Sequence, residues 1–188
     1  MAKRNGGFTI VELLIVIVVI AILAAITITA FNGIQQRTRD SKRVADMNSI
    51  KKSLELYKLQ NGRYPFVSYS GLGSQGGWET SAMESPGQFL AELANFGFSS
   101  GTPVDPVNDG TDSSTSLARS QNHYGYYYYR YAAGNAGCDP ALGAYYILGF
   151  INAESNNGGN VAQGSPGFSC SGRNWGNEFD WVTGGFEG

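Results

Sequence analysis

Several residue types are scarce in this chain of 188 residues, and each scarcity argues against a class of site. The chain has one histidine, His123, and two cysteines, Cys138 and Cys170. A lone imidazole without a recognisable nucleophile or carboxylate partner does not predict catalysis, and two cysteines without a nearby histidine pair do not predict zinc. There is no nucleophile elbow and no phosphate-binding loop. We therefore expect a protein that is not an enzyme.

Charge is also scarce near the N-terminus, where Glu12 is the one charged residue between Arg4 and Arg37. An α-helix rises about 1.5 Å per residue, so the 24 residues from Phe8 to Phe31 span roughly 36 Å. A bilayer core is about 30 Å thick. This segment is therefore long enough to form a complete transmembrane helix.

Two basic residues, Lys3 and Arg4, precede this apolar run. By the positive-inside rule they place the N-terminus in the cytoplasm and the remainder of the chain outside. The apolar core of an ordinary secretory signal is about 7 to 15 residues long, shorter than this run, and Glu12 inside the run also argues against such a signal. An uncleaved single-pass anchor fits the same length and hydropathy.

No proline occurs before Pro65, so we expect the helix to continue beyond the apolar run, as one helix of about 53 residues from Phe8 to Gln60. In its second half the apolar residues recur every three or four positions, which predicts a helix with one buried face. These residues are Val44, Met47, Ile50, Leu54 and Tyr57. Asn61-Gly62 has the composition of a helix C-terminus.

The C-terminal two thirds are rich in glycine and predict short strands and loops around one soluble core. Residues 124–132 and 144–151 are aromatic or β-branched and predict two strands joined as a hairpin through residues 134–143. We expect a short helix from Ser85 to Leu93, and a last strand or irregular aromatic segment over residues 174–186. The tyrosines around these strands are expected mainly in the core, rather than as an exposed adhesive surface.

Charge is unevenly distributed along the rest of the chain. Residues 37–63 hold eight Lys/Arg against three acids, whereas residues 64–188 hold eleven acids against three arginines, a net charge of −8. A head of that charge does not support nucleic-acid binding through general electrostatics.

The run Gly7-Phe8-Thr9-Ile10-Val11-Glu12-Leu13, followed by an apolar helix, resembles the class III signal of bacterial type IV pilins and type II secretion pseudopilins. The stretch from Leu56 to Pro65 also resembles the helix end and Tyr-Pro turn of that family. The resemblance covers about a third of the chain. It implies that prepilin peptidase cuts between Gly7 and Phe8, and that Phe8 becomes the N-methylated first residue of the mature subunit.

The same resemblance implies an α+β fold, in which one long N-terminal helix packs on a small antiparallel sheet. The expected divisions are a leader at residues 1–7, a transmembrane or fibre-core half at residues 8–31, and a globular head at residues 32–188. The implied partners are further copies of the chain and related pilins, the prepilin peptidase, an assembly ATPase and a platform protein in the inner membrane. The precursor would reside in that membrane and the assembled fibre outside the cell.

Glu12 is the residue to which we assign assembly register. A carboxylate inside an apolar helix is expensive to bury and usually has a partner. Cleavage creates an amine at Phe8, one turn away, and in the family this carboxylate is taken to pair with that amine on a neighbouring subunit. A buried charge with its partner on the next subunit penalises misaligned packing. The alternative is that Glu12 merely reaches the interface and is solvated.

A disulfide between Cys138 and Cys170 fits an extracytoplasmic compartment and resembles the disulfide-closed C-terminal loop of many type IV pilins. The alternative is two free thiols.

Oxygen-bearing side chains cluster in one loop and are of the type that calcium prefers. They are Asp105, Asn108, Asp109 and Asp112. Major pseudopilins carry calcium in this general region, but the spacing here does not fit an EF-hand, so we expect a solvated turn and no cofactor.

Three functions remain open at this stage. The first is a structural subunit of a type IV pilus that serves adhesion, motility or DNA uptake. The second is a pseudopilin of a type II secretion system. The third is an anchored outward-facing domain that never polymerises.

Intact-mass and peptide mass spectrometry of the membrane-extracted protein tests the leader prediction. We expect a mature chain that starts at an N-methylated Phe8. A chain that still starts at Met1 would favour the simple anchor.

Overall fold

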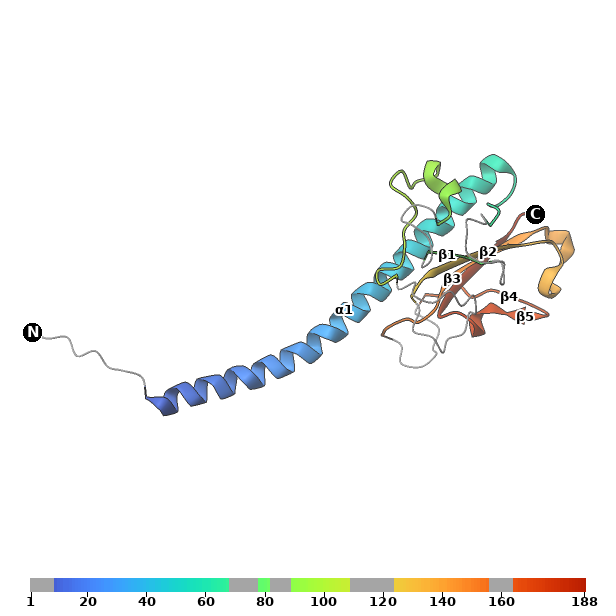
Figure 1. Cartoon of the computed structure of the whole chain (residues 1–188). Helices are drawn as coiled ribbons and strands as arrows, with labels where there is room; N and C mark the ends of the chain where they lie inside the picture. Colours follow the sequence, from blue (N-terminus) through green and yellow to red (C-terminus); the bar gives the residue numbers. More distant parts are fainter. Residues whose placement is uncertain (1–8, 68–77, 82–88, 109–123, 156–163) are drawn as a thin grey trace, which may run out of the picture. The chain divides into compact units, whose positions relative to one another are not determined.

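The computed structural model describes residues 9–67, 78–81, 89–108, 124–155 and 164–188. Its first element is one long helix, α1 (Ile10–Asn61), and short strands and 3-10 helices follow (Figure 1). The chain divides into two compact units, Met1–Thr38 and Arg39–Gly188. We call the second the head unit; it holds the last part of α1 and every strand found in the described residues. The predicted α+β architecture is confirmed, whereas the boundaries expected at residues 7 and 31 stay predictions.

α1 ends where the sequence predicted. The helix stops at Asn61, and Gly62 takes the left-handed conformation, with φ of 72°. Its amide donates a hydrogen bond to the Lys58 carbonyl oxygen over 2.7 Å. Residues with a Cβ rarely adopt this conformation, so glycine is favoured there.

The buried face of α1 is the predicted apolar stripe. Met47, Ile50 and Leu54 are fully buried, Tyr57 is nearly so, and Val44 packs against their cluster. Burying a large apolar side chain stabilises a fold by about 1.5–3 kcal/mol, so this stripe contributes substantially to attaching helix to sheet. The partners from the sheet and its flanking segments include Phe89, Leu93, Tyr126, Tyr128, Tyr146, Leu148, Phe150 and Trp181.

Within the part of the chain that the structure describes, the main sheet has four antiparallel strands in the order β1-β2-β3-β6. The strands are β1 (Glu79–Thr80), β2 (Tyr126–Tyr131), β3 (Tyr145–Phe150) and β6 (Trp181–Phe186). β2 and β3 pair from Tyr126 opposite Phe150 to Tyr131 opposite Tyr145, which confirms the predicted hairpin. Two 3-10 helices, η3 (Asn135–Gly137) and η4 (Pro140–Leu142), lie in its connection.

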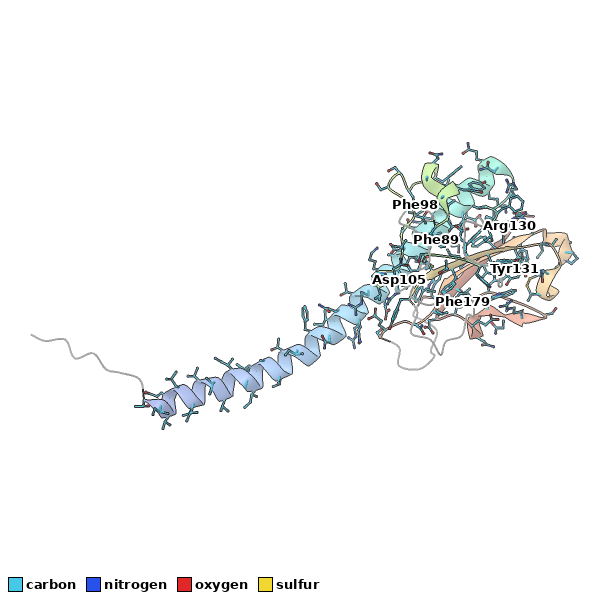
Figure 2. All side chains as sticks on the ribbon, viewed as in Figure 1. Phe89, Phe98, Asp105, Arg130, Tyr131 and Phe179 are labelled. Atoms are coloured by element: carbon cyan, nitrogen blue, oxygen red, sulfur yellow. A yellow bond between two sulfur atoms is a disulfide. The ribbon has the colours of Figure 1, made fainter. Side chains whose placement is uncertain are left out.

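The far face of the sheet is covered by a second aromatic layer that the sequence reasoning did not foresee. Tyr131 and Phe179 lie on this side, away from Phe89 (Figure 2). The covering segment contains a two-stranded hairpin, β4 (Ser169–Cys170) with β5 (Arg173–Asn174), and the 3-10 helix η5 (Trp175–Asn177). The buried members of the layer are Tyr131, Cys138, Tyr145, Ile147, Ile151, Trp175, Phe179 and Val182.

Gly149 in the middle of β3 allows this layer to pack closely. A Cβ at this position would lie 2.5 Å from the Trp181 carbonyl oxygen and 2.7 Å from the Phe179 ring. A glycine inside a strand often marks such a close approach. Because successive strand residues face opposite sides, Tyr145 and Ile147 join the far layer while Tyr146 and Leu148 face α1.

A disulfide joins Cys138, between η3 and η4, to Cys170 in β4, with 4.8 Å between the Cα atoms. Two hydrogen bonds accompany it. The Gly172 amide donates to the Ala136 carbonyl oxygen over 3.1 Å, and the Ser171 hydroxyl donates to the Gly137 carbonyl oxygen over 2.8 Å. The disulfide thus ties the covering hairpin to the β2–β3 connection.

The helix expected from Ser85 to Leu93 is wrong at its C-terminal end. Leu90 has a left-handed φ of 48°, and a 3-10 helix, η2 (Ala91–Asn95), follows it. The buried Glu79 accepts a hydrogen bond from the Leu90 amide and stabilises this turn. Ser85, the expected N-cap, lies outside the described residues, as does His123.

Replacing both Cys138 and Cys170 by serine tests the disulfide. In the chain-entropy model, a loop of this size stabilises the fold by about 3–4 kcal/mol. For a protein of this length we expect the Tm to fall by roughly 10 °C. Circular dichroism of the detergent-solubilised protein measures it, and reduced wild type should match the variant. An unchanged Tm in both would contradict the prediction.

Candidate assembly site

The N-terminal part of α1 is an apolar segment, Ile10–Ile34, whose large side chains are all exposed in the single chain. Their exposed fractions run from 49% at Val19 to 78% at Ile10. The hydroxyls of Thr27 and Thr38 donate within the helix to the carbonyl oxygens four residues earlier. α1 contains a stretch long and apolar enough to cross a membrane, and the Thr27 and Thr38 hydroxyls do not need water as a partner.

Glu12 closes a capping box at the start of this segment. Its Oε2 accepts hydrogen bonds from the Thr9 amide and the Thr9 hydroxyl, both over 2.8 Å. The Glu12 amide donates in return to the Thr9 Oγ1 over 3.3 Å, and the Thr9 carbonyl accepts from Leu13. These reciprocal bonds satisfy amides that the helix leaves without partners.

The capping box gives the Glu12 carboxylate partners within its own chain. The pattern Thr9-x-x-Glu12 preceding an apolar run was visible in the sequence as a capping signature. Our reading of Glu12 as a register residue overlooked it. Gly7 and Phe8 lie outside the described residues, so cleavage, methylation and the pairing of Glu12 with a new amine stay predictions.

A second polar site lies at the start of the head unit, where Arg43 of α1 is fully buried. Its guanidinium binds Asp105 through two hydrogen bonds, of 2.7 Å from Nε and 3.0 Å from Nη2. Its Nη1 donates to Asp40 over 2.6 Å and lies 2.9 Å from Glu154. One arginine therefore binds three carboxylates: Asp40 on α1, Asp105 in the chain after η2, and Glu154 in the chain after β3.

Asp40 and Glu154 extend this network to the backbone. Asp40 accepts hydrogen bonds from the amides of Glu154 and Ser155, over 3.0 and 2.7 Å, and from the Ser155 hydroxyl. Glu154 also accepts from Arg39, with its Nε at 2.7 Å. The network attaches the first turns of α1 in the head unit to the loop that follows β3.

These contacts shift the pKa values of two carboxyl groups downward. Burial by itself raises the pKa of Asp40, but the hydrogen bonds from Ser155, Glu154 and Arg43 outweigh it and lower that pKa. The hydrogen bond from Arg39 is the main reason for the lowered pKa of Glu154. Both carboxylates therefore stabilise the fold when ionised.

Asp105 corrects one expectation from the sequence. It is not part of a solvated turn, because it is almost fully buried, and both of its carboxylate oxygens bind Arg43. Arg43 lies outside the apolar stripe that the sequence predicted and is nevertheless fully buried. Of the other candidate calcium ligands, Asn108 accepts a hydrogen bond from Ser81, while Asp109 and Asp112 lie outside the described residues.

A further ion pair holds the other end of α1 to the C-terminal segment. Arg130 of β2 binds Glu187 through two hydrogen bonds of 2.7 Å, and Glu187 also accepts from the Tyr64 amide. Lys58 donates to the Phe186 carbonyl oxygen over 2.6 Å. Burial raises the pKa of Glu187, but the hydrogen bonds from Arg130 and Tyr64 outweigh it and leave the pKa below its ordinary value.

An apolar helical segment with one capped glutamate, followed by an α+β head unit, is similar to the arrangement of prepilins. The family model described as "Prokaryotic N-terminal methylation motif" matches residues 2–28. This match covers the basic leader, the predicted cleavage site and most of the apolar segment.

The chain is also similar in sequence to several known proteins. It is 35% identical over 74 residues to the type II secretion system core protein G of Dickeya chrysanthemi, covering 39% of this chain and 48% of that protein. It is 36% identical over 63 residues to the Aeromonas hydrophila protein of the same name, covering 34% and 44%. It is 44% identical over 62 residues to the type IV wide pilus major component PilA4 of Thermus thermophilus, covering 32% and 47%.

The predicted resemblance to type IV pilins and type II secretion pseudopilins is thereby confirmed. The chain spans about half the length of the curated relatives it matches, and the matched part is about a third of this chain. No solved structure matches.

Replacing Arg43 by Met tests the buried network. The variant keeps an unbranched, apolar stem but is shorter and leaves three carboxylates without their shared cation, and removal of one partner of a buried pair costs about 3–5 kcal/mol. Lys52→Met is the matched control, because Lys52 is exposed on the same helix. Thermal unfolding at pH 7 should show a large loss of Tm for Arg43→Met alone.

The pH dependence follows from the lowered pKa values of Asp40 and Glu154. Their stabilisation is present above the ordinary values of 3.8 and 4.5 and is lost as the pH falls through the folded values. The gap in Tm between wild type and Arg43→Met should therefore narrow from pH 7 to pH 3. A difference in Tm between the two proteins that does not change with pH would contradict a stabilising role of the ionised Asp40 and Glu154.

Proposed function

We propose that this protein is a structural, non-catalytic subunit of a type IV pilus, processed by prepilin peptidase and polymerised through its N-terminal helix. The observation that carries the proposal is the apolar segment Ile10–Ile34, exposed on every side and headed by the Thr9–Glu12 capping box. Such a surface needs either lipid or other apolar helices around it. Storage in the inner membrane followed by assembly into an extracellular fibre supplies both environments in turn.

Assembly requires partners that act on this segment. The proposed partners are the peptidase, an ATPase, an inner-membrane platform protein and further copies of this chain or related pilins. The basic leader leaves with the peptidase cut, so the mature segment keeps Glu12 as its one acid and gains an amine at Phe8. Pairing of that amine with Glu12 of a neighbour would replace the bonds that Thr9 provides in the single chain.

Two features of the head unit favour the pilin over the pseudopilin. The disulfide between Cys138 and Cys170 closes the C-terminal loops, as in many type IV pilins. The Arg43 guanidinium supplies the positive charge at Asp105, one of the acids considered as a calcium ligand. We propose that the head unit uses this internal cation and needs no calcium there.

The second candidate is a pseudopilin of a type II secretion system. It is favoured by the names of the relatives from Dickeya chrysanthemi and Aeromonas hydrophila, both called type II secretion system core protein G. Both candidates require the same polymerising helix. Long surface fibres at the natural expression level would favour the pilus, and their absence together with a block in protein secretion on gene deletion would favour the pseudopilin.

Substitution of Glu12 separates a register role from simple helix capping. Glu12→Gln keeps a carbonyl oxygen for the Thr9 amide but cannot form an ion pair with an amine. We expect both Glu12→Gln and Glu12→Ala to be inserted and processed, and to yield roughly tenfold less fibre or lower, because truncating one partner of a buried charge pair costs about 2–5 kcal/mol.

The measurement is the sheared-fibre fraction relative to total processed protein, on immunoblots. Glu92→Gln is the control, because Glu92 is an exposed acid of the head unit. Normal fibres from Glu12→Gln, with loss in Glu12→Ala, would show that capping is what matters. Normal fibres from both would remove Glu12 from the assembly site.

A further inference from the structure

The first four basic residues after the apolar segment Ile10–Ile34 all lie on α1. Three of them pair with carboxylates of the chain: Arg39 with Glu154, Lys42 with Asp46, and Arg43 with Asp40, Asp105 and Glu154. Arg37, the first of the four, is exposed, and its side chain has no ion pair or hydrogen bond within the part of the chain that the structure describes. Its positive charge is therefore available to an anion outside the chain.

The position of Arg37 fits a phospholipid headgroup. Arg37 follows Ile34, the last large apolar side chain of the segment, by three residues, a rise of about 4.5 Å. The hydrocarbon core of a bilayer is about 30 Å thick and the whole bilayer about 40–45 Å, so each headgroup region is about 5–8 Å thick. With Ile34 at the edge of the hydrocarbon, Arg37 lies among the headgroups. A guanidinium there can bind a phosphate through two parallel hydrogen bonds.

The other charge of the first compact unit lies at a matching distance. Glu12 precedes Arg37 by 25 residues, all of them in α1 and in the unit Met1–Thr38. At about 1.5 Å per residue the two charges are about 37 Å apart along the helix axis. A tilt of about 20°, the average for membrane helices, shortens this span by only about 2 Å. The span exceeds the hydrocarbon core but not the whole bilayer, so both charges fit in headgroup regions at once.

Moving the helix along the bilayer normal would remove this fit. A shift by two turns, about 11 Å, would take either Arg37 or Glu12 into the hydrocarbon, where a charge is costly. The bilayer therefore favours one depth for this segment. At that depth the Thr9–Glu12 capping box meets headgroups and water.

We infer that Arg37 binds headgroup phosphates on the outer side of the inner membrane and so sets the depth of the stored subunit, with Glu12 in the opposite headgroup region. The inference rests on the proposed function, which stores the subunit in that membrane. The ligand is a lipid rather than free phosphate because Arg37 adjoins exposed apolar side chains, on which acyl chains pack. Glu12 leaves its polar surroundings only when other subunits replace the lipid.

Native mass spectrometry of the detergent-solubilised protein, titrated with phosphatidylglycerol, tests the lipid contact. Arg37→Gln should need roughly fivefold more lipid than wild type for the same bound fraction, because it loses the charge and the paired donors. Lys52→Gln is the matched control, since Lys52 is an exposed cation of the same helix, and it should bind as wild type does. Equal binding by Arg37→Gln and wild type would overturn the inference. So would displacement of the lipid by inorganic phosphate, which would identify a site for the free anion.

Nitroxide labels measure the depth in vesicles of phosphatidylethanolamine and phosphatidylglycerol. Both native cysteines are in the disulfide, so an introduced cysteine is the free thiol that takes the label. Labels at Val11→Cys and Ile34→Cys should both lie near a bilayer surface, as judged by access of a nickel chelate relative to oxygen. A Val11→Cys label with the oxygen access of the bilayer centre would contradict the inference.

The same labels show whether Arg37 sets the depth. Arg37→Leu lengthens the apolar run, so the helix should slide toward the cytoplasmic side by about 3 Å, two residues of rise. The Ile34→Cys label should become deeper and the Val11→Cys label shallower, whereas Lys52→Leu should move neither. Depths unchanged by Arg37→Leu would remove Arg37 from this role.

The outcomes separate this inference from the proposed function. Wild-type cells with sheared fibres, but with a Val11→Cys label deep in the hydrocarbon, would overturn the inference and leave the pilus in place. Label depths as expected, in cells that make no fibres, would support the lipid contact and refute the pilus.

Discussion

The structure depends on a change of surroundings along a single helix. Up to about Ile34, α1 exposes large apolar side chains all round, and the Thr27 hydroxyl donates to a carbonyl oxygen of the helix itself. From Asp40 on, one face is buried against a sheet and the others meet water. The same helix thus exposes apolar side chains in one part and packs against its own head unit in the other. The division between the two compact units falls at this change, between Thr38 and Arg39.

Ion pairs of the head unit lie near the beginning and the end of its part of α1. Arg43 joins the helix to Asp105 and to Glu154 after β3. Glu187 binds Arg130 and the Tyr64 amide, and so holds the C-terminal segment close to the end of α1. Between them the apolar stripe packs without charge. Apolar contacts provide most of the attraction, while ion pairs that lose much energy when misaligned fix the position of the helix on the sheet.

Periodicity predicted the parts of this fold that depend on local pattern. The stripe from Met47 to Tyr57, the stop at Gly62 and the hairpin of two aromatic strands were all visible as spacings. The partners of Arg43 were not, because 62 residues separate it from Asp105. A basic residue on a polar helix face and a buried one that binds three acids look the same in sequence. The far aromatic layer was missed for a related reason, since its covering segment has only two-residue strands.

The acids counted in the sequence are also not all exposed at the surface. The region from Tyr64 onward has a net charge of −8 by composition, but Glu79, Asp105 and Asp180 are buried, and the Glu154 and Glu187 side chains are only 9% and 13% exposed. These acids act inside the fold. Residues 39–63 of the head unit add seven Lys/Arg and three acids, which brings the net charge of residues 39–188 to −4. In the proposed fibre, repulsion between neighbouring heads, which falls off over about 8 Å at physiological ionic strength, would therefore be weaker than a charge of −8 implies. Head units packed side by side in that fibre would need less counterion to remain together, and such fibres would bundle laterally at modest salt.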